Sequence, residues 1–379
     1  MMRVLHAYKI YLPDAYGGIP HVIAMLAQLP RAKFESFVLV ARAFGLRRRF
    51  SIDGAAVDAV TSLGTAFSTP MAASYPRTFA QQVKTMDVVV CHAPFPLADI
   101  GVLFGLPRRT ALIVHWHAEV IGRRFLARLI APLVRRTLVR ADKIVVSNQA
   151  MIDNSAFLRR HASKCEIVPY GCDFAYWSTL DELQRAAADE LRKKYPRLVV
   201  AVGRLVGYKG YEIFLRALQD VDAQAIIIGD GPLKTELKTL AKHLAISDRV
   251  TLLGSQPNDE VKQYVCAAKV LAFPSTTNAE AFGLVQLEAM AAGRPIVNTA
   301  LGTAVPHVAR DGREGLTVPP NDAPALARAL RRLLDDPELA SKLGSAGAAR
   351  ARAEFDQALF LQRMQTVYSE AAAQRDLNA

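Results

Sequence analysis

Short apolar runs rich in β-branched residues alternate with helical stretches throughout both halves of this 379-residue chain. Such alternation is typical of parallel sheets flanked by helices, because a parallel strand is usually reached through a helical crossover. In the first half we expect strands at residues 4–8, 37–41, 87–91, 111–115 and 143–147. In the second half we expect them at residues 198–202, 225–228, 250–253, 270–273, 296–298 and 315–318. The predicted fold class is therefore α/β, with two doubly wound, Rossmann-like domains.

The length of the chain also favours two domains, because one hydrophobic core seldom grows past about 250–300 residues. We place the first domain at residues 1–170 and the second at residues 171–354, joined near the segment IVPYGCDFAYW. A last amphipathic helix within residues 355–379 is expected to cross back onto the first domain. Two such domains facing across a cleft would bind ligands at the carboxyl ends of their strands.

Hydropathy and cysteine usage limit the classes of protein to consider. The chain has no run of 18 or more apolar residues, so we predict no membrane span. Its first residues, MMRVLHAYKIYL, are expected to form a strand and not a signal peptide. The four cysteines are scattered without a C-x-x-C pair, which indicates reduced thiols and no metal site. We expect a cytoplasmic protein without a metal ion or cofactor.

The net charge of +12 belongs to the first half of the chain. Residues 1–170 hold 22 Lys and Arg against 10 Asp and Glu, whereas residues 171–379 hold 25 of each. A basic domain can bind nucleic acid, but no nucleic-acid-binding motif is present, so we expect no such partner. Two segments fit an anionic membrane surface better: FGLRRRF at residues 44–50, and a helix at residues 123–140 with six arginines and no acid. The apolar side of that helix is expected to comprise Leu126, Leu129, Ile130, Leu133, Val134 and Leu138.

The most informative segment runs from residue 276 to residue 298, TTNAEAFGLVQLEAMAAGRPIVN. It follows an apolar strand and predicts a tight loop and a helix ended by a glycine and a proline. The unpaired amides at the start of such a helix form an anion site. Glu288 lies about five residues into the helix, roughly 7.5 Å along its axis, which matches the separation of a phosphate from its ribose. Glu280 lies on the other side of the phosphate position, so the segment predicts a nucleotide-sugar site.

The same segment closely resembles the signature of family 4 glycosyltransferases, in which seven residues separate two glutamates. The resemblance covers nearly the whole chain and implies the GT-B fold, with the donor nucleotide on the second domain and the acceptor on the first. It implies that Glu280 binds the transferred sugar and Glu288 binds the ribose. The amides of the segment FGLV are then expected to contact the diphosphate; this segment consists of Phe282, Gly283, Leu284 and Val285.

Two cations complete the expected donor site. The segment GRLVGYKG resembles the family motif whose arginine and lysine hold the leaving diphosphate, and it places Arg204 and Lys209 in these roles. Fixed cations stabilise the negative charge that gathers on a departing diphosphate. An Asp-x-Asp at residues 220–222 has the form of a manganese-binding motif of another fold, but it precedes a strand and is expected to be a solvated turn.

The first domain contributes a glycine turn and a strand-end histidine. Gly17 and Gly18 open a helix after the first strand, at the position of the family's glycine loop against the donor diphosphate or acceptor. His117 matches the family's strand-end histidine, which contacts the transferred sugar. We expect His115 to be structural and to point to the opposite face of the strand, which would argue against a shared metal ion.

The resulting hypothesis is a retaining hexosyltransferase that uses a nucleotide-diphosphate sugar. The HWHAEV segment and the basic helix look most similar to mannosyl- and rhamnosyltransferases of surface polysaccharide assembly, such as that of lipopolysaccharide. GDP-mannose or a related GDP-sugar is the favoured donor and a lipid-linked glycan the favoured acceptor, handled by a peripheral protein at the inner face of the cytoplasmic membrane. The alternatives are a nucleotide-sugar 2-epimerase on the same fold, or a non-catalytic basic protein that binds membrane or nucleic acid.

Overall fold

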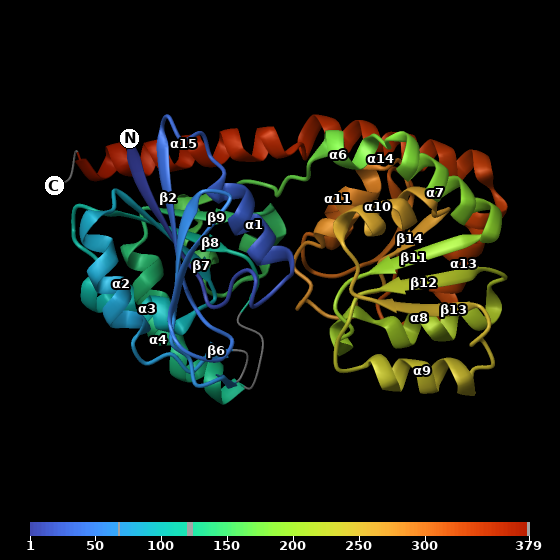
Figure 1. Ribbon diagram of the computed structural model, residues 1–379, viewed down its shortest axis with the longest axis horizontal. Coiled ribbons are helices and arrows are strands. Elements are labelled where there is room, and N and C mark those ends of the chain that lie inside the picture. The colour runs from blue at the N-terminus through green and yellow to red at the C-terminus, as the bar shows by residue number, and fades with distance from the viewer. Residues whose placement is uncertain (67–68, 120–123, 377–379) are drawn as a thin grey trace. The chain divides into compact units, whose positions relative to one another are not determined.

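The chain forms two compact α/β units in a computed structural model that describes residues 1–66, 69–119 and 124–376 (Figure 1). The first unit comprises residues 1–170 and the chain from Phe360 onward, and the second comprises Gly171–Leu359. The last helix, α15 (Gln357–Asp376), therefore begins in the second unit and belongs for most of its length to the first. In the described part of the chain, no helix is both long enough and apolar enough to cross a membrane.

The first unit is built on an eight-stranded sheet in the order β10-β9-β8-β7-β1-β2-β4-β3. Its strands are β1 (Met2–Ala7), β2 (Phe34–Ala41), β3 (Arg48–Ile52), β4 (Ala55–Val60), β7 (Val88–Ala93), β8 (Ala111–Trp116), β9 (Lys143–Val146) and β10 (Cys165–Ile167). Neighbours are parallel except β3, which pairs antiparallel with β4 through an Asp53-Gly54 turn. Five of these strands were predicted. The sequence interpretation missed β3, β4 and β10, although an Asp-Gly pair with positive φ at both residues is a strong hairpin signal.

Helices cover both faces of this sheet, as a doubly wound fold requires. One face packs against α2 (Tyr75–Gln82), α3 (Pro96–Gly105), α4 (Arg124–Arg140) and α5 (Gln149–Asn154). The other face packs against α1 (Gly18–Ala27) and, through Tyr368, against α15 beside β1 and β2 (Figure 1). A short hairpin of β5 (Thr65–Ala66) and β6 (Thr69–Pro70) and the 3-10 turns η1 (Val83–Thr85) and η2 (Arg159–Lys164) complete the unit.

The predicted basic helix is α4, and it runs without a break through Pro132. Val134 and Leu138 are buried as expected, but Leu129 is exposed, so the predicted apolar side is only partly buried. Arg123 lies outside the described residues, as do the side chains of Arg124 and Leu126.

The second unit is built on a six-stranded, fully parallel sheet in the order β13-β12-β11-β14-β15-β16. Its strands are β11 (Leu198–Val202), β12 (Gln224–Ile228), β13 (Val250–Gly254), β14 (Val270–Ala272), β15 (Ile296–Thr299) and β16 (Gly315–Val318). All six strands were predicted to within about two residues, because a strand covered on both faces is a continuous apolar run.

Helices also cover both faces of the second sheet (Figure 1). On one face lie α8 (Tyr211–Ala217), α9 (Lys234–His243) and α13 (Ala323–Asp335). On the other lie α7 (Glu182–Lys194), α10 (Asn258–Ala267), α11 (Leu284–Ala291) and α14 (Pro337–Glu354). The short helices α6 (Phe174–Ser178) and α12 (Val305–Val308) and the turns η3 (Gly207–Lys209) and η4 (Leu218–Asp220) connect these elements. Asp322 and Asp336 cap α13 and α14 through amides three residues ahead, contacts that each stabilise a helix by about 1 kcal/mol.

Candidate functional site

Each sheet has one point where the strand order reverses, and the predicted site residues gather at these points. In the second unit, the chain winds from β11 through β12 to β13 on one side and from β14 through β15 to β16 on the other. The reversal therefore lies between β11 and β14. In the first unit it lies between β1 and β7 by the same reasoning. Open α/β sheets bind ligands outside the carboxyl ends of the strands at such a point.

Lys209 and Glu280 form a largely buried ion pair at the reversal point of the second unit. Lys209 ends the turn η3 after β11, and Glu280 lies in the loop after β14. The Lys209 Nζ atom is 2.5 Å from Glu280 Oε2, and Ser275 Oγ donates to the same oxygen at 3.2 Å. Lys209 Nζ also lies 5.1 Å from the centre of the Phe273 ring. The two predicted residues are thus brought together, and Ser275 joins them without having been predicted.

Glycines allow the loops around this pair to approach one another closely. Gly210 has φ +70°, and a Cβ atom there would lie 1.9 Å from the carbonyl oxygen of Pro274. Gly283 has φ +81°, and a Cβ atom there would lie 2.3 Å from Phe273 Cζ. Gly283 is also the N-cap of α11 and offers no side chain to bond its first amides. The start of α11 therefore has the open amides that the sequence predicted at Leu284 and Val285.

Glu288 lies within α11, half-buried. Burial raises the pKa of its carboxyl group to about 7, although the positive charge of Lys209 acts in the opposite direction. Its carboxylate has no hydrogen bond or ion pair within the described part of the chain. A half-buried carboxylate without a protein partner is a candidate for binding a ligand hydroxyl.

Of the other residues predicted for the donor site, Arg204 is exposed and Phe282 is buried. Arg204 follows β11 with its side chain exposed, and its guanidinium has no ion pair among residues 1–66, 69–119 and 124–376. Phe282 is buried edge-on against Phe355, with ring centres 6.4 Å apart, and its carbonyl accepts a bond from Gln286 Nε2 at 2.9 Å. Phe282 therefore positions the loop through its side chain, and only its backbone can face a ligand.

At the reversal point of the first unit, four histidines share one face of the sheet. His6 lies on β1, His92 on β7, and His115 on β8 with His117 directly after it. His92 and His115 are register partners on neighbouring strands. The expectation that His115 and His117 point to opposite faces was wrong, because residues two apart on a strand point the same way. Their ring centres are 4.2 Å apart.

Three of these histidines and a tyrosine form a continuous buried hydrogen-bonded series, which we call the histidine chain. Tyr170 Oη lies 2.6 Å from His117 Nδ1, His117 Nε2 lies 2.7 Å from His92 Nδ1, and His92 Nε2 lies 3.1 Å from His6 Nδ1. Both ring nitrogens of His117 are therefore engaged inside the protein. His117 was predicted, whereas His6 and His92 were missed. Histidines near the carboxyl ends of adjacent parallel strands were the signal for them.

The histidines of this cluster are neutral at physiological pH. Burial lowers the pKa of His6 and of His115 to about 3. Burial also holds the pKa of His92 and of His117 well below 6.5, and the neighbouring imidazoles lower both further. The first unit thus has a neutral, sealed cluster where the second has a charged pair.

The predicted glycine turn lies at the same edge of the first sheet. Gly17 has φ +148°, a backbone conformation that favours glycine, and it precedes α1 without a capping side chain. Both Gly17 and Gly18 are exposed, and no atom lies within 4 Å of a Cβ built on Gly17. The turn is thus open to a ligand, as its predicted role requires.

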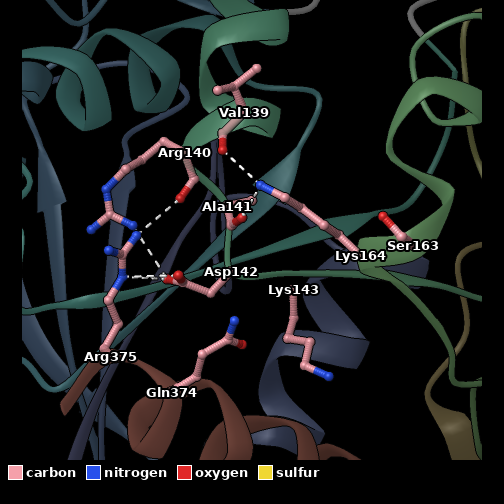
Figure 2. A pocket seen from close by; sticks show the side chains of 9 residues that line it. All are labelled: Val139, Arg140, Ala141, Asp142, Lys143, Ser163, Lys164, Gln374 and Arg375. Carbon is pink, nitrogen blue, oxygen red and sulfur yellow. Dashed lines mark hydrogen bonds and ion pairs between the residues drawn. The ribbon is translucent and has the colours of Figure 1, made fainter. Parts of the chain in front are cut away.

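Two other charged features lie away from the reversal points. The Asp-x-Asp at residues 220–222 precedes β12, at the edge of the sheet opposite the reversal point. A cavity of about 320 Å³ lies at the amino end of β9, but its cations are already engaged (Figure 2). Arg375 Nε lies 2.9 Å from Asp142 Oδ1, and Lys164 Nζ donates to the carbonyls of Val139 and Ala141 at 2.7 Å each. These contacts hold α15 and the end of α4 on the sheet.

The chain matches known proteins over almost its full length. Residues 17–171 match the family described as Glycosyl transferase 4-like domain, and residues 184–350 match Glycosyl transferases group 1. Over 360 residues the chain is 31% identical to the D-rhamnosyltransferase WbpZ of Pseudomonas aeruginosa, covering 93% of this chain and 92% of that one. It is 29% identical over 351 residues to the O-antigen chain mannosyltransferase C of Escherichia coli, covering 90% and 91%.

Solved structures agree on the fold. HepE of Anabaena, in complex with UDP and glucose, has a TM-score of 0.79 at 20% identity and covers 97% of this chain and 100% of its own. The predicted two-domain GT-B architecture is confirmed, and so is the predicted enzyme class, because both full-length relatives are named transferases. The epimerase and the non-catalytic binding protein are accordingly set aside. The chain belongs to the glycosyltransferases that join a 4-like amino-terminal domain to a group 1 carboxy-terminal domain.

Proposed function

We propose that this glycosyltransferase moves a mannose- or rhamnose-type hexose, with retention, from a nucleotide-diphosphate sugar to a hydroxyl of a lipid-linked glycan. The observation that carries the proposal is the Lys209–Glu280 pair beside the open start of α11. It combines a cation for a diphosphate with an acceptor for sugar hydroxyls at the reversal point of the sheet. Neither group would need to enter the site after the donor binds.

The diphosphate is bound by cations in place of a metal ion. Lys209 has three ammonium hydrogens, and Glu280 and the aromatic face of Phe273 leave at least one of them for a phosphate oxygen. Arg204, which is exposed, supplies a second cation. The amides at the start of α11 add donors aligned with the helix dipole. Together they stabilise the charge that the leaving diphosphate acquires in the transition state.

The two glutamates bind the two sugars of the donor. Glu280 Oε2 is held by Lys209 and Ser275, whereas Oε1 has no bond to the described residues and accepts hydroxyls of the transferred hexose. Glu288 accepts hydroxyls of the ribose. Retention follows if the leaving phosphate takes the acceptor proton on the same face of the hexose.

The most detailed part of the proposal is the identity of the nucleobase and of the transferred sugar. The names of the two full-length relatives support a rhamnosyl or mannosyl group, and we favour a GDP-sugar as donor. HepE was crystallised with UDP, so UDP is the natural competitor. Thermal-shift titration should show a larger rise in melting temperature with GDP than with UDP. Transfer from GDP-mannose or GDP-rhamnose, with the anomeric configuration of the product read by NMR, then tests sugar and retention. Inverted product, or a preference for UDP, would contradict the corresponding part.

An exposed apolar loop supports peripheral binding at the inner face of the cytoplasmic membrane. Phe44 and Leu46 are 71% and 79% exposed. Two backbone bonds between Gly45 and Ser62 place them beside Leu63, which is also exposed. The arginines of this segment are less available than expected, because Arg47 and Arg49 both pair with Asp58. We therefore assign most of the membrane contact to the apolar side chains, with exposed arginines attracting anionic lipid.

Vesicle flotation tests this contact. With anionic lipid at low salt, the native protein should float, and the Phe44→Ser, Leu46→Ser double variant should float markedly less. Leu183→Ser is the matched control, since Leu183 is 84% exposed on the second unit and should not affect flotation. A native protein that stays at the bottom of the gradient would overturn the membrane assignment.

A further inference from the structure

The histidine chain links His117 to residues that no ligand can reach directly. His6 and His92 are fully buried, and His117 is 3% exposed. The series begins at Tyr170, the last residue of the first unit, and ends at His6 Nε2, a buried nitrogen with no hydrogen-bond partner in the described part of the chain. Packing alone would not require imidazoles here, because Leu or Phe would fill the same volume without an unsatisfied polar atom.

The geometry of the histidine chain couples the tautomers of its three imidazole rings. Each neutral imidazole has one N–H and one bare nitrogen, and each bond in the chain needs one hydrogen. If Tyr170 donates to His117 Nδ1, then His117, His92 and His6 all carry their hydrogen on Nε2. If the bonds run the other way, all three carry it on Nδ1. The three rings must therefore share one tautomer, and they change tautomer together.

Low pKa values support this bonding scheme. Burial keeps each of the three imidazoles neutral near pH 7, so no ring has two hydrogens that would interrupt the series. His115 lies within the same cluster but outside the chain, because neither of its ring nitrogens has a partner among the described residues. His115 therefore serves as an internal comparison: it is as buried as the three histidines of the histidine chain and lies on the same face of the sheet, but it is not hydrogen-bonded to them.

A metal ion is the competing explanation for this cluster. His92, His115 and His117 have ring nitrogens within 4.8 Å of one another. Nitrogens around a tetrahedral zinc ion are closer, at about 3.3 Å for Zn–N bonds of about 2.0 Å. Two of the three residues already bond each other at 2.7 Å, which an intervening ion would prevent. The observed distances fit a hydrogen-bonded series better than a ligand set.

We propose that His6 and His92 are positioning residues that fix the ring of His117 and determine which of its nitrogens is the donor. This rests on the proposed transfer of a hexose in one respect: as the family resemblance implies, His117 would contact a hydroxyl of that hexose. To do so, His117 must exchange one of its two present partners for that hydroxyl. If Tyr170, itself a hydroxyl donor and acceptor, gives way at Nδ1, then His92 and His6 determine whether that nitrogen donates or accepts.

The tautomers can be measured without any assay of transfer. In protein labelled with ¹⁵N-histidine, long-range proton–nitrogen spectra distinguish hydrogen on Nδ1 from hydrogen on Nε2. Single-histidine variants assign the eight residues. We expect one common tautomer for His6, His92 and His117. Different tautomers among the three would overturn the proposed histidine chain even if the enzyme is active. So would one equivalent of metal in the purified protein together with loss of these signals on zinc addition.

Kinetics test whether the chain serves the reaction. His6→Leu should lower kcat by about tenfold or more with little change in the donor KM, because the orientation and tautomer of His117 are altered while the donor groups lie in the second unit. His6→Asn, which keeps a polar group at the Nδ1 position, should restore most of kcat. His115→Leu is the matched control and should leave kcat within about twofold. If His6→Leu retains full kcat, or is no worse than His115→Leu, the positioning role is wrong.

The two readouts separate the inference from the proposed function. If the three histidines share one tautomer but no transfer from any nucleotide sugar is detected, the proposed function would be refuted, whereas the proposed coupling within the histidine chain would stand. If the native enzyme transfers sugar but the three histidines have different tautomers, only the proposed coupling within the histidine chain would be refuted.

Discussion

The two reversal points show two ways of building polar groups into an α/β sheet. In the second unit the groups are charged: Lys209 and Glu280 neutralise each other, while Glu288 has no ion pair with any residue that the structure describes. In the first unit the groups are neutral, buried imidazoles, three of which are bonded in series. Burying an unpaired charge costs far more free energy than burying a neutral ring, and hydrogen-bond partners for the ring nitrogens lower the cost of the ring. We infer that the second unit is built to receive charge and the first to present a fixed ring.

Removing one member of the charged pair should have the largest effect. Glu280→Ala leaves Lys209 without its counterion and removes the proposed acceptor for the hexose, so kcat/KM for transfer should fall by about 10²–10³-fold. Lys209→Ala should fall by a similar factor, mainly in kcat, because it acts on the leaving diphosphate. Steady-state kinetics with saturating acceptor measure both.

Glu280→Gln separates charge from hydrogen bonding. Gln retains the shape of the side chain and can still bond a sugar hydroxyl, so Glu280→Gln should retain more activity than Glu280→Ala if hydroxyl binding dominates.

The double variant Glu280→Ala, Lys209→Ala tests whether the two groups act together. Its loss in kcat/KM should be smaller than the product of the two single losses, because the groups contact each other. Fully independent losses would show that the pair is not a functional unit.

The contrast between the units also shows what could be predicted from sequence. The residues assigned to the donor could be named from the sequence because they lie in one segment or follow neighbouring strands: Glu280 and Glu288 lie in one strand–loop–helix segment, and Lys209 follows the strand next to it. Sequence spacing cannot show that Lys209 is paired with Glu280, because that contact joins two loops.

The histidine chain was largely missed because it depends on register. His6, His92 and His117 come from three strands, and their contacts arise only when β1, β7 and β8 are aligned side by side. The edge strand β3 was missed for a different reason: it is rich in exposed arginine and lacks the apolar run that identifies a buried strand.

Acidification should affect donor binding through Glu288. Its pKa of about 7 means that the carboxylate is mostly ionised at pH 8 and mostly protonated at pH 6. If the ionised form accepts ribose hydroxyls, donor KM should rise about tenfold between these values. Glu288→Gln should have a high KM that is independent of pH in this range. A native KM that does not change with pH would contradict the assigned role.

The same groups predict opposite effects of pH on stability. The pKa of Glu288 is raised on folding, so its contribution to stability falls as pH rises from about 4.5 to 7, and Glu288→Gln should be the more stable form at pH 8. The pKa of the buried histidines is lowered, so the unfolded chain binds more protons below pH 6.5 and acid destabilises the first unit. Melting curves of native protein and Glu288→Gln between pH 5 and pH 8 test both signs.

The smallest effect, and the sharpest test of the contrast within the first unit, concerns stability at constant pH. His115 is fully buried, and neither of its ring nitrogens has a partner among the residues described, so His115→Leu should stabilise the protein by about 1 kcal/mol, or about 2–4 °C in melting temperature. The same change at His6 leaves His92 Nε2 without its partner, and it should give no such gain. Equal shifts for the two variants, measured at pH 7.5 where both histidines are neutral, would show that the chain contributes no more than packing does.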